Sequence, residues 1–156
     1  MSFATGGRAA FAVAFFALEL AGIAYGQSAP DHVFGFQMFN ESSRLTIHLF
    51  REVERAGRRE LVPLADGRWQ APDADGQPHA HAWQDRVGAQ AYPLNMLERS
   101  VHASYGLSAQ LFRLQAALDD TVRHLERDAE TRALVAQVDT LQNGRTGLLR
   151  LRADKP

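Results

Sequence analysis

The sequence predicts an α+β protein, with an N-terminal transmembrane helix followed by a small antiparallel sheet packed on one main helix. Three observations lead to this fold class. Residues 9–26 are apolar apart from one acid, residues 45–53 alternate between apolar and polar, and residues 109–127 repeat apolar side chains every three or four positions. Strands that precede and follow a single long helix are typical of an antiparallel sheet covered on one face by that helix.

Length and composition limit the classes of function. The chain has 156 residues, enough for one compact domain and an anchor. Its formal net charge of -1 provides no basic face for non-specific nucleic-acid binding, so we expect no nucleic-acid partner. The absence of cysteine excludes disulfides, thiol chemistry and cysteine-ligated metal.

The apolar run at residues 9–26 is predicted to be a membrane anchor. As a helix it would be about 27 Å long, close to the roughly 30 Å of a bilayer core. Residues 1–8 are short and polar with a single cation, Arg8, and residues 27–43 contain no cation before the domain at 44–156. Cations collect on the cytoplasmic side, so we expect a single-pass protein of the cytoplasmic membrane with residues 1–8 inside. The domain would then face the periplasm or exterior.

Two other interpretations of this run stay open. A cleaved signal peptide fits the order of a polar start, an apolar centre and Ala24-Tyr25-Gly26 before Gln27. Glu19 counts against it, because an acid is unusual in the apolar centre of a signal peptide. A helix buried in a soluble core is the third interpretation, and the weak amphipathic alternation counts against that one.

Glu19 predicts a protein contact inside the membrane. An acid at the centre of a membrane helix costs about 2.5–3.5 kcal/mol and usually faces protein or water. Small side chains at helical spacing let neighbouring helices approach closely. The predicted partner-binding residues are Glu19, Gly22, Gly26, Ala14, Ala17 and Ala21. The alternatives are that alanine is merely frequent in such segments and that Glu19 is protonated on a lone helix.

The first half of the domain is predicted to contain paired strands. Pro30 ends the anchor helix, and residues 27–43 form an aromatic-rich juxtamembrane segment. Residues 45–53 read as a strand with one buried face, and residues 60–64 as its short partner after a turn at Gly57. Residues 71–93 are expected to be irregular because three prolines and two glycines interrupt them, although 81–87 could be extended.

The second half is predicted to contain the main helix and a hairpin. Residues 93–105 are expected to form one or two helical turns, and Ser108 is the predicted N-cap of the following helix. The apolar stripe of that helix consists of Leu111, Leu114, Leu118, Val122 and Leu125. Residues 131–152 read as a hairpin around Asn143-Gly144, a strong turn signal.

Three stretches carry a resemblance to a known group of proteins: residues 34–43, 102–119 and 128–145. Together with "FALELAG" in the apolar run, they resemble small single-pass membrane proteins of bacteria, best represented in actinobacteria. Such proteins accompany multi-pass proteins of the HTTM class, which are similar to vitamin K-dependent carboxylases. The resemblance covers most of the chain, implies a multi-pass partner and supplies no active-site residue.

Enzyme chemistry has one weak candidate site. His79 and His81 share a face of an extended chain, and Asp85 follows, so these three could ligate zinc or iron. The competing interpretation is a solvated polar loop. His48 is expected to be an ordinary surface residue, and Ser104 lacks the glycines of a nucleophile elbow. No cofactor is expected, and whether the chain is an enzyme stays open.

Three functions follow from these features. The first is a membrane-anchored accessory subunit whose partners are the lipid bilayer and a multi-pass membrane protein. The second is an exported metal-dependent enzyme, and the third is a domain that binds a small ligand between sheet and helix. The first is favoured because the most unusual residue, Glu19, lies in the apolar run while no catalytic constellation is complete.

Overall fold

The chain divides into two units, which are described separately. The computed structural model describes residues 3–28, 42–55, 57–88 and 91–156. Unit 1 is Met1–Asn40 and unit 2 is Glu41–Pro156. The predicted juxtamembrane residues 29–41 lie outside the described residues.

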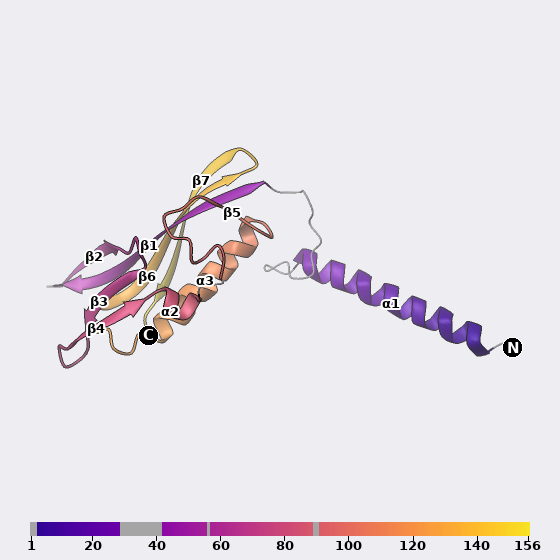
Figure 1. Cartoon of the computed structure of the whole chain (residues 1–156), viewed down its shortest axis with the longest axis horizontal. Helices are drawn as coiled ribbons and strands as arrows, with labels where there is room; N and C mark the ends of the chain where they lie inside the picture. Colours follow the sequence, from indigo (N-terminus) through magenta and orange to yellow (C-terminus); the bar gives the residue numbers. More distant parts are fainter. Residues whose placement is uncertain (1–2, 29–41, 56, 89–90) are drawn as a thin grey trace. The chain divides into compact units, whose positions relative to one another are not determined.

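Unit 1 contains one long helix, α1 (Phe3–Ser28, 26 residues; Figure 1). The helical structure predicted at residues 9–26 is confirmed, whereas the membrane crossing predicted for it is not. The polar residues 3–8 continue the helix toward the N-terminus, because they contain no proline and glycine is tolerated at a cost of only about 1 kcal/mol. Within the described part of the chain, no helix combines the length and the apolar character that crossing a membrane requires.

Unit 2 is built on an antiparallel sheet in the order β2-β1-β6-β7. Its long strands are β1 (Ser43–Arg55), β6 (Thr131–Gln142) and β7 (Arg145–Asp154), and β2 (Arg58–Pro63) is shorter. The two-residue strand β5 (Val101–His102) pairs with the start of β1. The class is therefore α+β with an antiparallel sheet, as predicted.

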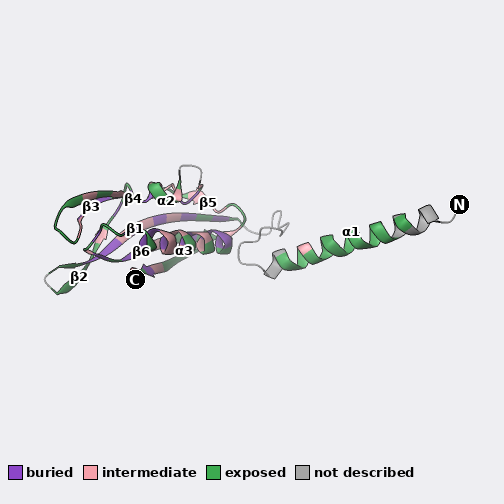
Figure 2. Cartoon of the chain, turned by 90° about the horizontal axis from the view of Figure 1, so that it is seen from below, coloured by how far each residue is buried: buried purple, intermediate pink, exposed green. Residues whose placement is uncertain are grey.

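The inner face of the sheet packs against α3 (Leu107–Arg123). Leu45, Ile47 and Leu49 of β1 alternate toward this face and are at most 2% exposed. They join a single core cluster with Leu114 and Leu118 of α3. The buried residues of unit 2 follow this sheet and helix in Figure 2. The predicted apolar stripe is confirmed from Leu111 to Val122, whereas Leu125 joins the core from just beyond the end of the helix at Arg123.

The predicted β6–β7 hairpin is confirmed in its turn and its register. Asn143 and Gly144 both have positive φ, 49° and 81°, as a two-residue turn of this kind requires. The strands pair from Gln142 opposite Arg145 to Ala133 opposite Asp154.

Three local predictions in unit 2 were wrong. Residues 71–93 contain a second hairpin, β3 (Arg68–Pro72) and β4 (Pro78–Ala82), followed by the short helix α2 (Gln84–Val87). The prolines stand at the ends of these strands, where they interrupt no ladder.

The helical turns expected at 93–105 are replaced by turns and β5, since this segment lies along one edge of β1. The main helix starts one residue before the predicted N-cap, Ser108, and Gly106 occupies the cap position with φ of 90°. A side chain at that φ is strained, so the backbone angle selects glycine over a serine cap.

Candidate functional site

Helix α1 exposes apolar side chains around almost its whole circumference. From Ala10 to Tyr25 every side chain is exposed except Gly22, which is half-buried. Leu18 and Leu20 are 74% and 66% exposed, although they lie on nearly opposite sides of the helix. A water-soluble surface helix normally hides one apolar stripe, whereas the described residues of α1 leave their apolar side chains exposed.

The predicted partner-binding residues occupy this helix together. Ala14, Ala17, Ala21 and Glu19 are exposed, and Gly26 lies within the helix. Adding a Cβ atom at Gly22 would meet nothing within 4 Å. Ala14, Ala17 and Ala21 are therefore not covered by other described residues.

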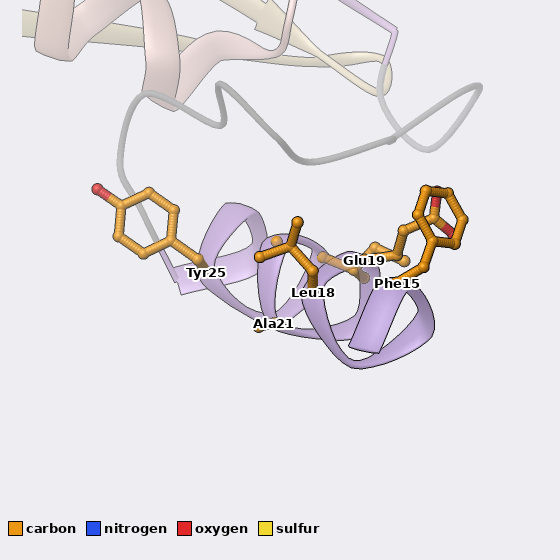
Figure 3. A pocket seen from close by; sticks show the side chains of 7 residues that line it. Phe15, Leu18, Glu19, Ala21 and Tyr25 are labelled. Carbon is orange, nitrogen blue, oxygen red and sulfur yellow. The ribbon is translucent and has the colours of Figure 1, made fainter. Parts of the chain in front are cut away.

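Glu19 belongs to an open pocket on α1, lined by Phe15, Leu18, Glu19, Ala21, Gly22, Ile23 and Tyr25. In Figure 3 the side chains of Phe15 and Glu19 project from the same side of the helix. They are four residues apart and hence adjacent on the surface. The pocket combines one carboxylate with aromatic and aliphatic walls, which suits a partner that offers a polar group within an apolar helix face.

The predicted metal ligands do not form a metal centre. His79 bonds through Nε2 to Asp73 Oδ2 at 2.9 Å, and His81 Nε2 lies 3.2 Å from the carbonyl oxygen of Arg127. Asp85 is an exposed residue of α2. Among the described residues, no three His, Cys, Asp or Glu side chains are placed to hold one metal ion.

His79 is bonded within the β3–β4 hairpin, because Asp73 lies in the turn of that hairpin, whereas His81 reaches residue 127 outside it. Trp69 of β3 lies opposite His81 of β4, and their rings stack with centroids 5.4 Å apart. Both histidines lie on one extended face, as predicted, and both are part-buried.

A three-residue cluster around His48 was missed by the sequence analysis. His48 Nδ1 lies 2.6 Å from Glu98 Oε2, and Nε2 lies 3.0 Å from Asp139 Oδ2. The imidazole therefore joins β1, β6 and the segment at residues 91–100. His48 was expected to be an ordinary surface residue, but its side chain is only 29% exposed and both nitrogens have a carboxylate partner.

The cluster favours a charged imidazole. A neutral ring has one N–H and can donate to only one carboxylate, whereas the imidazolium donates to both. Partial burial opposes protonation, but the hydrogen bonds to Asp139 and Glu98 outweigh it and raise the pKa of His48 above 6.5. Because the two acceptors lie on opposite sides of the ring, the cluster is an ion-pair clamp and not a metal site.

We expect the stability of unit 2 to fall as this clamp loses its proton. The folded-state pKa of His48 is raised, so its stabilisation is complete below the unfolded-state value near 6.5 and is lost as pH rises through the folded-state pKa. Urea denaturation between pH 5 and 9 should show wild type losing stability relative to His48→Gln on the alkaline side. Asp139→Asn should reduce the pH dependence and serves as a partner control. Parallel pH curves for wild type and His48→Gln would contradict the clamp.

Nothing in the sequence could have identified this cluster by spacing alone. Glu98 and Asp139 are 50 and 91 residues from His48. Glu98 is held in place by a backbone bond from its N–H to the carbonyl oxygen of Ile47, at 3.0 Å, and has φ of 58°. Only the register of β1 with β6 and the path of residues 91–100 bring the three together.

Comparison of the chain with protein-family models, with curated proteins and with solved structures gives no match. The resemblance to single-pass bacterial membrane proteins stays a prediction.

Proposed function

We propose that the protein is a membrane-anchored accessory subunit that binds a multi-pass membrane protein through α1. The observation that supports this most strongly is the exposure of apolar side chains all around that helix. Fully burying a side chain such as Phe or Leu contributes about 1.5–3 kcal/mol, so lipid or protein around α1 is strongly favoured over water.

Glu19 supports a protein partner in addition to lipid. A carboxylate among hydrocarbon tails is unfavourable, and a hydrogen-bond donor on a neighbouring helix removes much of that cost. Gly22, which has no side chain, lies about one turn from Glu19 in the same open pocket. It would allow close approach of a partner helix that carries such a donor.

The proposed location follows from the distribution of cations. Arg8 precedes the apolar residues, and the next cation in the sequence is Arg44. This distribution supports a membrane location with the N-terminus on the cytoplasmic side. Cell fractionation should recover the full-length chain with membranes. A soluble chain, or a mature chain that begins after Gly26, would contradict this location.

The partner contact is tested by substitutions at Glu19. We expect a multi-pass protein to co-purify with the full chain in mild detergent. Glu19→Leu should lower its recovery roughly five- to thirtyfold, equivalent to about 1–2 kcal/mol for an interhelical polar contact, whereas Glu19→Gln should retain it. Quantitative mass spectrometry of the purified complex measures both.

Leu20→Ile is the matched control for Glu19→Leu, because residue 20 is an exposed neighbour on α1 outside the predicted contact. Its recovery of partner should equal that of wild type. If Glu19→Leu recovered as much partner as wild type, or if the chain purified without any multi-pass protein, the proposed partner would be rejected.

A further inference from the structure

The outer face of the sheet, opposite α3, carries cations and leucines at one end. Arg44 of β1 lies opposite Leu141 of β6, and Leu148 and Arg150 follow at alternate positions of β7. Directly paired and alternate residues share a face, so these four side chains form one surface, the outer-face patch. Leu141 and Leu148 are 39% and 66% exposed.

The charges of this patch are available to a ligand. Arg44 and Arg150 are exposed, and within the described residues neither makes an ion pair. The acid nearest to them in the sheet is Asp139, which lies opposite Leu148 and bonds to His48. The patch therefore combines free guanidinium groups with exposed leucines, the combination that suits an anionic interface with hydrocarbon beneath it.

The outer-face patch lies at the end of the sheet where the chain enters unit 2. Asn143 at the hairpin turn accepts a hydrogen bond from Ser42 N–H through Oδ1, and its own N–H donates to Ser42 O, both at 2.9 Å. Ser42 is the first described residue after α1. This end of the sheet is therefore the part of unit 2 that is separated from α1 by the fewest residues.

We propose that the outer-face patch docks on the surface of an anionic lipid bilayer. This inference depends on the proposed membrane location, since α1 would hold unit 2 at high local concentration near the lipid. Arg44 and Arg150 contact lipid phosphates, and Leu148 enters the headgroup region. Each arginine near an anionic surface changes the docking equilibrium about fivefold.

The experiment uses the full chain in lipid vesicles with an environment-sensitive fluorophore at Leu148→Cys. The chain has no natural cysteine, so labelling is specific. We expect a blue shift in vesicles that contain phosphatidylglycerol, little shift in pure phosphatidylcholine, and reversal by high salt. Ala74→Cys, an exposed position in the β3–β4 turn, is the label control and should show no shift.

Arg44→Gln with Arg150→Gln should remove most of the shift. The matched control is Arg58→Gln with Arg68→Gln, which removes two exposed arginines from other strands and should retain it. A chain that floats with vesicles while residue 148 stays in water overturns the docking but leaves the proposed function intact. A chain that does not float overturns both. A shift that is independent of lipid charge and grows with protein density assigns the patch to a second copy instead, and also overturns the docking.

Discussion

Asp128→Ala is expected to destabilise unit 2 by about 3–5 kcal/mol, the cost of breaking a buried charged pair. The side chain of Asp128 is fully buried. Its Oδ1 accepts hydrogen bonds from the backbone N–H groups of Glu130 and Thr131, and its Oδ2 accepts from Thr131 Oγ1 and Trp69 Nε1. All four donors would lose their acceptor.

Arg51 makes the loss larger. The Arg51 side chain is 6% exposed, and its Nη1 lies 3.9 Å from Asp128 Oδ2. Among the described residues, Nε and Nη1 of Arg51 have no hydrogen-bond partner. Removing the carboxylate would leave only Glu130, 3.5 Å from Nη2, to compensate the buried cation.

Urea denaturation followed by circular dichroism measures the change in the free energy of unfolding. Asp128→Asn keeps one acceptor oxygen but loses the charge, so its loss should be intermediate. Asp75→Ala removes an exposed acid and should change stability by no more than about 0.5 kcal/mol. If Asp128→Ala were as stable as Asp75→Ala, the network would not be holding the structure together.

The same carboxylate should contribute to acid unfolding. Burial by itself would raise the pKa of Asp128, but hydrogen bonds from Thr131 and Trp69 and the charge of Arg51 hold it below 3.8. A lowered folded-state pKa gives stability that is present above the unfolded value and lost as pH falls through the folded value. Stability below pH 4 should therefore fall less steeply in Asp128→Asn than in wild type.

Trp83→Ala is expected to cost about 3–5 kcal/mol by leaving a cavity in the core. The side chain of Trp83 is 0% exposed and belongs to the core cluster with Leu97 and Leu94. Its Nε1 donates to the carbonyl oxygen of Leu94 at 2.9 Å. Close packing on the other side is shown at Gly67, where an added Cβ would lie 3.0 Å from Trp83 Cβ.

Trp83→Phe is the matched variant for this prediction. It keeps an aromatic ring but leaves the Leu94 carbonyl without its donor, so we expect a smaller loss of about 1–3 kcal/mol. The same denaturation experiment gives both values. Equal losses for the two variants would show that the hydrogen bond, rather than the volume of the ring, accounts for the role of Trp83.

The proposed membrane functions and these stability predictions concern different units. The substitutions at Asp128 and Trp83 act on unit 2, whereas Glu19 lies in unit 1. A variant such as Asp128→Ala should therefore still partition with membranes when it loses its sheet. This separation allows a loss of partner binding to be assigned to α1 instead of to unfolding.

The sequence by itself determined the elements whose patterns are long and local. The alternation in β1 and the three-and-four spacing of Leu111, Leu114 and Leu118 each repeat a simple geometric period, and the Asn143-Gly144 turn is a signal of two adjacent residues. The nearly continuous apolar run at residues 9–26 likewise predicted a helix, because that prediction uses only neighbouring residues and no distant contacts. These patterns were sufficient for the class α+β.

Only the tertiary structure decided the positions of the polar groups. The spacing of His79, His81 and Asp85 predicted a possible metal site, whereas in the folded chain His79 bonds to Asp73 and His81 lies against Arg127. Likewise, His48 meets Glu98 and Asp139 only through strand register and the path of an irregular segment. The physical reason is that a polar side chain is fixed by its nearest partner in space. Sequence spacing does not encode that partner when it lies 46 or more residues away, as it does for His81 and His48.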